Sequence, residues 1–216
     1  WLYDHFYPMF NQTSRYILEP WTVLPSLAAE TTHLRLGVLV TCNSYRFPPV
    51  LAKIAASVDV MSRGRLEFGI GAGWYENEYI AYGISFPDIK TRIEQLAESI
   101  EIIKRIWTEE RADFRGEYYN VIDLFSYPKP VQKPHPPIWR GGKDSRLLRV
   151  VSQHADYANF AQCSVEELSQ RLAVLKRYCH QVGRNFEEIQ KTWHGNVIIV
   201  NKEEKLRGEA LRVKES

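Results

Sequence analysis

Three short stretches of the sequence combine residue types that could bind a small ligand or move a proton. In the first, Asp4 and His5 follow an apolar segment that could be the end of a β-strand. Both side chains would then lie at the mouth of a parallel sheet, where an imidazole can act as a general acid or base near neutral pH. The alternative is structural: a buried histidine satisfied by a neighbouring carboxylate.

The second stretch is the glycine-rich run LEFGIGAGWYENEY at residues 66–79. A dinucleotide fingerprint, G-x-G-x-x-G, would need its third glycine at position 74, where the sequence has a tryptophan. The run therefore does not predict dinucleotide binding. Glycines could let the backbone lie flat against a planar ligand, because they have no side chain to intervene. They could equally let a strand crowd a neighbouring helix.

The third stretch is RGGKDS at residues 140–145. Two glycines, a lysine and free backbone N–H groups at the start of a helix are typical of a phosphate site. The alternative is an ordinary turn between a strand and a helix, with Asp144 or Ser145 as the N-cap.

Other chemistries lack their motifs. The six histidines show neither H-x-H nor H-E-x-x-H spacing, so we predict no metal site. The chain has no G-x-S-x-G elbow, no P-loop and no kinase signature. Glu76 and Glu78 are close enough to pair, but we expect both carboxylates to be solvated on a loop.

Composition narrows the class of protein. The 216 residues are 44% hydrophobic and 25% charged, which fits one globular domain over residues 1–216. Lys and Arg number 28 against 26 Asp and Glu, and a net charge of +2 predicts neither nucleic acid nor membrane as a partner. No apolar stretch reaches the roughly 18 residues of a membrane span. Three cysteines without a C-x-x-C motif favour reduced thiols, so we expect a soluble, cytoplasmic protein.

The elements that must position these residues alternate along the chain. Apolar runs predict parallel strands at 34–41, 66–73, 137–142, 157–161 and 195–200, and the segment 1–5 could end another. Helical stripes lie between them. We predict helices over about 20–32, over 50–61 with Gly64 as its stop, from a capping box at Thr91–Glu94 to Trp107, from near Ser145, and over 165–182 between a box at Ser164–Glu167 and Gly183.

This βαβ rhythm indicates a parallel sheet, either open and doubly wound or closed as a (β/α)8 barrel. A doubly wound fold usually carries a glycine fingerprint after its first strand, and none is present. Two irregular stretches, 74–90 and 109–136, are long enough to act as functional lids over the frame.

Taken in order, the segments WLYDHF, LRLGVLVTCNSYRFPPVLAKIAASVDVMSRGRLEFGIGAGWYENEYIAYGISFP and PVQKPHPPIWRGG resemble the luciferase-like monooxygenase family. The similarity is closest to the branch that uses the deazaflavin coenzyme F420, and it extends to about residue 200. The resemblance implies a (β/α)8 TIM barrel that binds a flavin or deazaflavin at its C-terminal face. It also implies that the first and last strands are missing from the given chain.

The same resemblance assigns roles to residues. His5 would be the acid/base beside the cofactor ring. The end of the strand at 34–41 would carry a bulge with a non-prolyl cis peptide between Leu39 and Val40. The implied cofactor-binding residues are Asp4, Leu39, Val40, Thr41, Cys42, Gly71, Ala72, Gly73, Asn77, Gly141, Gly142, Lys143, Asp144 and Asn159.

Two departures limit the resemblance. Trp74 stands where a sugar-phosphate dehydrogenase of the family has a glutamate, which argues against that substrate. The phosphate turn is also often richer in glycine than RGGKDS.

The resulting hypothesis is an F420-dependent oxidoreductase that passes a hydride between the deazaflavin and a small organic substrate. One alternative is an FMN-dependent monooxygenase in which reduced flavin activates oxygen. The other is a flavin-binding protein without turnover, because a family fixes a scaffold and not an activity. A homodimer is among the expected assemblies.

Overall fold

The computed structural model describes residues 1–6, 8, 16–141, 144–195 and 199. Its main sheet has five strands, all parallel, whose spatial order follows their order in the chain. A parallel bridge between Leu2 and Val38 adds the N-terminal segment beside the first of them. The strands are β1 (Leu36–Cys42), β2 (Leu66–Gly71), β5 (Ile138–Arg140), β6 (Tyr157–Ala161) and β7 (Gln190–His194).

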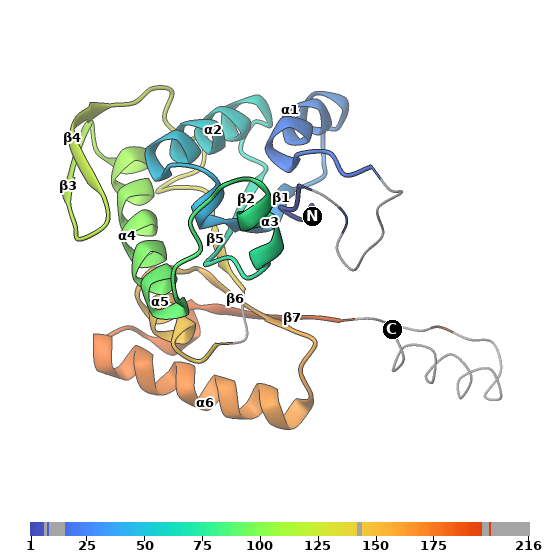
Figure 1. The fold of residues 1–216 in the computed structure, drawn as a ribbon, viewed down its shortest axis with the longest axis vertical. Helices are drawn as coiled ribbons and strands as arrows, with labels where there is room; N and C mark the ends of the chain where they lie inside the picture. The colour runs from blue at the N-terminus through green and yellow to red at the C-terminus, as the bar shows by residue number, and fades with distance from the viewer. Residues whose placement is uncertain (7, 9–15, 142–143, 196–198, 200–216) are drawn as a thin grey trace.

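Helices form a layer outside this sheet. Those that follow one another in the chain pack against each other, and together they form an arc around the strands (Figure 1). This arrangement and the unreversed strand order are those of a barrel wall and not of a doubly wound sheet. The helices are α1 (Pro20–Glu30), α2 (Pro48–Met61), α4 (Ile89–Thr108), α5 (Leu147–His154) and α6 (Val165–Val182).

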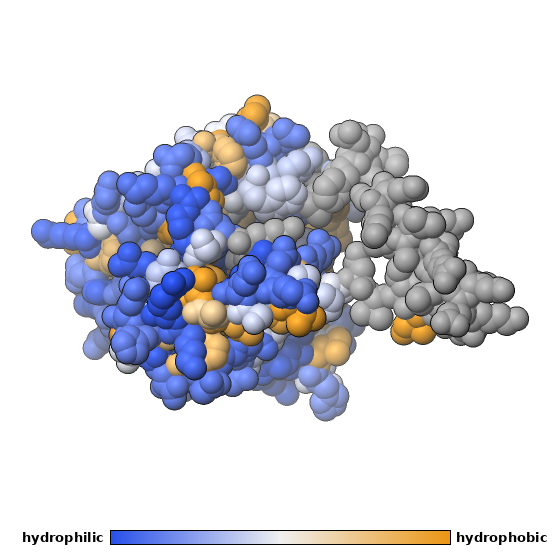
Figure 2. All heavy atoms as spheres, turned by 90° about the horizontal axis from the view of Figure 1, so that it is seen from below, coloured by the Kyte–Doolittle hydropathy of each residue, from blue (hydrophilic) through white to orange (hydrophobic). Residues whose placement is uncertain are grey.

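The core lies between the sheet and these helices. Phe68 of β2 meets Trp107 of α4 edge to face, with ring centroids 5.0 Å apart. The indole N–H of Trp107 donates to the carbonyl of Ala52 in α2 at 2.9 Å, so one buried side chain joins three elements. The outer surface on the side of α6 is mainly hydrophilic, with scattered apolar residues (Figure 2). No helix in the described part of the chain is long and apolar enough to cross a membrane.

Local signals explain several boundaries. The capping box at Ser164 and Glu167 is present, and Gly183 ends α6 in the left-handed conformation with φ 71°. Gly64 follows α2 with φ 79°. These residues confirm the predicted ends of α2 and α6, because glycine adopts positive φ at little cost.

Two predicted boundaries are wrong. Helix α4 begins after Asp88, whose carboxylate accepts the backbone N–H of Thr91, so Thr91 lies inside the helix. The last strand is Gln190–His194, not 195–200. Of the predicted range, residues 195 and 199 are not in a strand, and 196–198 and 200 lie outside the described residues. Strand β7 is largely polar and half-exposed, which gives no apolar run to detect.

The two stretches that we expected to be irregular contain short elements. Residues 74–90 include the helix α3 (Glu76–Ala81). Residues 109–136 include an antiparallel hairpin of β3 (Arg111–Arg115) and β4 (Asn120–Phe125), which forms a separate sheet. Single-turn 3₁₀ helices, η1 (Asn43–Tyr45) and η2 (Phe186–Glu188), follow β1 and α6. Helix α3 and η1 prove to carry site residues.

Candidate active site

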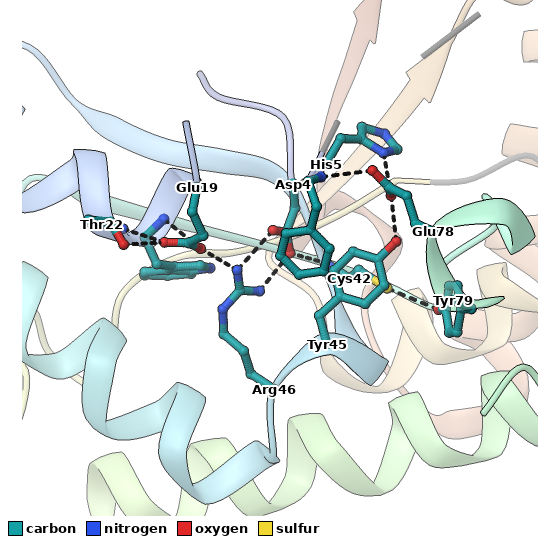
Figure 3. Close-up of polar contacts among 11 residues, drawn as sticks. Asp4, His5, Glu19, Thr22, Cys42, Tyr45, Arg46, Glu78 and Tyr79 are labelled. Carbon is teal, nitrogen blue, oxygen red and sulfur yellow. Dashed lines mark hydrogen bonds and ion pairs between the residues drawn. The ribbon is translucent and has the colours of Figure 1, made fainter. Parts of the chain in front are cut away.

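The His5 imidazole is held by a carboxylate 73 positions away in the chain. Its Nδ1 lies 2.8 Å from Oε2 of Glu78, whose side chain is 0% exposed. Two further donors converge on the same carboxylate: the Tyr45 hydroxyl on Oε2 at 2.6 Å, and the backbone N–H of Phe6 on Oε1 at 2.7 Å (Figure 3). Our expectation that Glu78 is solvated is therefore wrong.

The contact with Glu78 decides the hydrogen-bonding form of His5. A carboxylate only accepts hydrogen bonds, so the His5 Nδ1 carries the proton in this contact. The other ring nitrogen, Nε2, can then accept a proton when the ring is neutral and return it when the ring is protonated. The rings of Trp74 and Tyr75 stand edge-on to the imidazole, with centroids 5.8 and 5.9 Å away. The pair combines a titratable group with a partner that fixes its orientation.

Asp4 links the N-terminal segment to β1. Its Oδ2 accepts the backbone N–H of Cys42 at 2.8 Å and Nη1 of Arg46 at 2.8 Å, and its Oδ1 accepts Nη2 of Arg46 at 3.0 Å. Arg46 also pairs with Glu19, the N-cap of α1. Burial alone would lower the pKa of Arg46, but hydrogen bonds and charge from Asp4 and Glu19 raise it overall. The guanidinium therefore stays charged between two carboxylates.

Strand β1 carries the predicted bulge. The peptide between Leu39 and Val40 is cis, and the register with β2 shifts between Val38 and Thr41. This confirms the backbone feature expected at this position. Thr41 is fully buried, and its hydroxyl has no hydrogen-bond partner among the described residues.

Gly69 and Gly71 of β2 lie against this bulge, and Gly73, two residues after the strand, lies against α3. A Cβ on Gly69 would clash with the Val38 carbonyl, and one on Gly71 would lie 2.6 Å from Cγ2 of Val40. Gly73 has φ 75°, and a Cβ there would clash with the Tyr79 hydroxyl of α3. These glycines thus accommodate close protein neighbours. Contact of Gly71, Ala72 and Gly73 with a cofactor stays a prediction.

The end of β5 carries a buried cation. Arg140 is 2% exposed, and in the part of the chain that the structure describes its Nε and Nη2 have no hydrogen-bond partner. Burial lowers its pKa to about 9, against the opposing effect of nearby Asp144. Asp144 itself accepts hydrogen bonds from the backbone and guanidinium of Arg146, and Arg146 lowers its pKa. Gly141 follows Arg140 directly, whereas Gly142 and Lys143 lie outside the described residues.

A hollow of about 410 Å³ is lined by residues of the N-terminal segment and of strands β1, β5, β6 and β7. Leu39 of the bulge and Asn159 of β6 line it, and Asn77 lies exposed on α3. The complete lining is Trp1, Tyr3, Leu39, Trp139, Asn159, Thr192, Trp193 and His194.

Sequence reasoning missed several of these groups. Glu78, Tyr45 and Arg46 act through contacts with a segment far away in the chain, which local spacing does not report. Arg140 could have been noticed, because a charged residue at the end of an otherwise apolar strand needs a partner.

The chain matches the family model described as luciferase-like monooxygenase over residues 1–215. The chain belongs to the luciferase-like monooxygenase family. Among curated relatives, an F420-dependent glucose-6-phosphate dehydrogenase of Kineococcus radiotolerans is 37% identical over 133 residues, 61% of this chain and 39% of the relative. An FMNH₂-dependent dimethylsulfone monooxygenase of Pseudomonas putida is 30% identical over 139 residues, 64% of this chain and 38% of the relative. The chain thus spans about two-fifths of the length of these relatives.

Solved structures show the same fold. An F420-dependent secondary alcohol dehydrogenase, in complex with an F420–acetone adduct, superposes with a TM-score of 0.81 at 19% identity over 89% of this chain and 58% of its own. A monooxygenase from Streptomyces bottropensis has a TM-score of 0.79 at 22% identity over 99% of this chain and 64% of its own. With the parallel sheet and its outer helices, these likenesses confirm the predicted (β/α)8-barrel fold.

Proposed function

We propose that this protein is an F420-dependent oxidoreductase that passes a hydride between the deazaflavin and a small organic substrate, with His5 as the acid/base. The observation that carries the proposal is the contact between His5 and the buried carboxylate of Glu78. Hydride transfer at a carbon that bears oxygen needs a matched proton transfer, and Nε2 of His5 is the atom left to make it. A protein that only stores a flavin needs no titratable group held in this way.

The residues present fit a cofactor with an anionic tail. Arg140 offers buried guanidinium N–H groups that have no hydrogen-bond partner among the described residues, and Gly141 follows it in the chain. Such a cation is costly to bury unless a negative group joins it, so a phosphate would satisfy it. Arg140 and Gly141 would hold the tail, and the Leu39–Val40 bulge would support the ring. When bound, F420 supplies the two-electron hydride chemistry, and the protein supplies orientation and proton transfer.

The runner-up is an FMN-dependent monooxygenase, and the dimethylsulfone monooxygenase among the relatives favours keeping it. Both cofactors carry a phosphate, so Arg140 does not discriminate between them. We favour F420 because relatives named for it are more similar to this chain. Glucose 6-phosphate is not our proposed substrate, because Trp74 replaces the expected glutamate.

The test has two parts. Titration of the protein with F420 and with FMN, followed by absorbance, should give tight binding of the deazaflavin and weak binding of FMN; the reverse would refute the cofactor assignment. His5→Asn should then lower kcat by about 10²–10⁴, the range for loss of a general acid or base, with little change in F420 affinity. His33→Asn, at an exposed position, is the matched control. Full turnover in His5→Asn would remove His5 from the mechanism.

A further inference from the structure

Trp74 and Tyr75 form an aromatic wall beside the proposed acid/base. Both rings stand nearly perpendicular to the His5 imidazole, at 77° and 75°, with centroids 5.8 and 5.9 Å from it. The two rings of the wall lie 5.2 Å apart and at 35° to each other. Both therefore pack against the same imidazole, whose Nδ1 is turned toward Glu78 (Figure 3).

Trp74 is the exposed member of this wall. Its relative exposure is 59%, whereas the side chain of His5 is only 12% exposed. Because the two ring centroids are 5.8 Å apart, a molecule that contacts the accessible part of the imidazole also lies within reach of the indole. Indole surface that faces water gains free energy when a ligand covers it.

The backbone holds Trp74 in place from both sides. Gly73, just before it, has φ 75°, and the Gly73 carbonyl accepts Nη1 of Arg92 at 2.7 Å. Arg92 is itself buried on α4. On the other side, the Trp74 carbonyl accepts the backbone N–H of Glu76 at 3.1 Å, where α3 begins. The attachment point of the indole is thus fixed beside the imidazole before a ligand binds, which lowers the entropic cost of binding.

The exposed ring of Trp74 selects the shape of its ligand. A conjugated ring lies flat against an indole, whereas a saturated ring of the same size is puckered and touches it with fewer atoms. A cation gains little at a ring that stays half in water. Trp74 therefore favours a flat, conjugated ligand without a charge.

We propose that Trp74 is a specificity-determining residue, which stacks on a flat, conjugated group of the substrate. This contact would bring the oxygen on the neighbouring reacting carbon within reach of Nε2 of His5. As a statement about the substrate, the proposal rests on the proposed function, where it assigns a reacting carbon that adjoins an aromatic or other conjugated group. As a binding surface, Trp74 can be tested without the cofactor.

The test uses benzamide and cyclohexanecarboxamide, which share their size and polar group and differ in whether the ring is flat. Binding to the cofactor-free protein is followed by NMR through the indole ¹⁵N–¹H signal of Trp74, which is identified by its absence in Trp74→Leu. We expect benzamide to bind about 2–10-fold more tightly, as one stacked aromatic pair would give, and to shift this signal. Equal affinity for the two amides, or an unchanged Trp74 signal, would overturn the proposal.

Two further comparisons sharpen the test. Tetramethylammonium at the same concentration should leave the Trp74 signal unchanged, and a shift as large as that caused by benzamide would refute the choice of an uncharged ligand. Trp74→Leu should abolish the preference for benzamide, and Trp74→Phe should keep part of it. Phe125→Leu, at an exposed aromatic residue of the β3–β4 hairpin, is the matched control and should keep all of it. A preference that survives in Trp74→Leu would contradict the assignment.

Turnover separates this proposal from the proposed function. With reduced F420, acetophenone should be converted with a higher kcat/KM than cyclohexyl methyl ketone, and Trp74→Leu should remove the difference mainly through KM. Turnover without this preference would refute the role of Trp74 and leave the hydride transfer in place. A benzamide preference without turnover of either ketone would count against the hydride transfer and support the stacking surface.

Discussion

Replacing Glu78 with glutamine tests the tautomer of His5 directly. Glutamine has nearly the same shape, but only one of its two terminal atoms accepts hydrogen bonds. Glu78 now receives the backbone N–H of Phe6 on one oxygen, and the Tyr45 hydroxyl and His5 on the other. A backbone N–H cannot become an acceptor, so the amide oxygen should face Phe6. The amide NH₂ then faces His5 and forces its Nδ1 to accept, which moves the imidazole proton to Nε2.

The expected size follows from these contacts. Each hydrogen bond to the buried charge that becomes a neutral one should cost about 1–1.5 kcal/mol of unfolding free energy. With its Nε2 protonated, neutral His5 cannot take a proton from a substrate hydroxyl. We therefore expect kcat in the alcohol-oxidising direction to fall by about 10²–10⁴, with F420 affinity little changed.

The assay is steady-state turnover followed by F420 absorbance, with ¹⁵N NMR of the His5 ring as the structural readout. Glu76→Gln is the matched control, because that carboxylate lies exposed on the same helix. Normal turnover in Glu78→Gln with the NMR signature of an Nε2-protonated ring would show that the tautomer of His5 does not matter. Normal turnover with an unchanged ring would show that Glu78 does not set the tautomer.

Three further predictions rest on other contacts. Arg140→Met should stabilise the cofactor-free protein by about 1–3 kcal/mol, because it removes a buried charge whose Nε and Nη2 have no hydrogen-bond partner among the described residues. Inorganic phosphate should raise the melting temperature of the original protein but not of the variant, and phosphate protection that persists in the variant would refute this. Burial alone would raise the pKa of Glu19, but hydrogen bonds from Thr22 and Trp21 and the charge of Arg46 lower it below 4.5 overall. The stabilising contribution of Glu19 should therefore be complete above pH 4.5 and lost as the pH falls through the lowered pKa. In urea titrations, Glu19→Gln should lose less stability on acidification than the original protein, and an identical pH profile would contradict this. Gly73→Ala should lower the free energy of unfolding by about 1–3 kcal/mol because of its positive φ, and further because its Cβ would clash with the Tyr79 hydroxyl. Adding Tyr79→Phe should recover part of this stability. Strictly additive effects of the two substitutions in thermal denaturation would argue against the clash.

The parallel sheet could be predicted because its central strands are apolar on both faces. Strand β2 is buried throughout, and its sequence is a nearly continuous apolar run. Strand β7 belongs to the same sheet but is half-exposed, and its largely polar sequence lacks the apolar run by which the other strands were predicted. The start of α4 was predicted three residues too late, because Asp88 and Thr91 are both good capping residues and the sequence alone does not decide between them.

The site also has one part that could be predicted and one that could not. The cis peptide after Leu39 was expected because the family resemblance covers that strand end, whereas local propensity says nothing about it. The partner of His5 could not be found from spacing, because the contact with Glu78 spans 73 positions and depends on how α3 folds back over the N-terminal segment. The family resemblance therefore led to His5 as the proposed acid/base, and only the fold located the carboxylate that orients it.

The way in which the first residues join the sheet has a consequence for how activity is lost. Leu2 contributes a single β-bridge, and the other contacts of this segment described above involve side chains: those of Asp4, of Glu78, and of the His5 ring with Trp74 and Tyr75. Such a segment can detach locally at a lower free energy than the whole barrel needs to unfold. His5 would then lose its contact with Glu78 while the helices and sheet remain intact. On heating or in mild denaturant, catalysis should disappear before circular dichroism changes, and amide hydrogens of residues 2–6 should exchange well before those of β2.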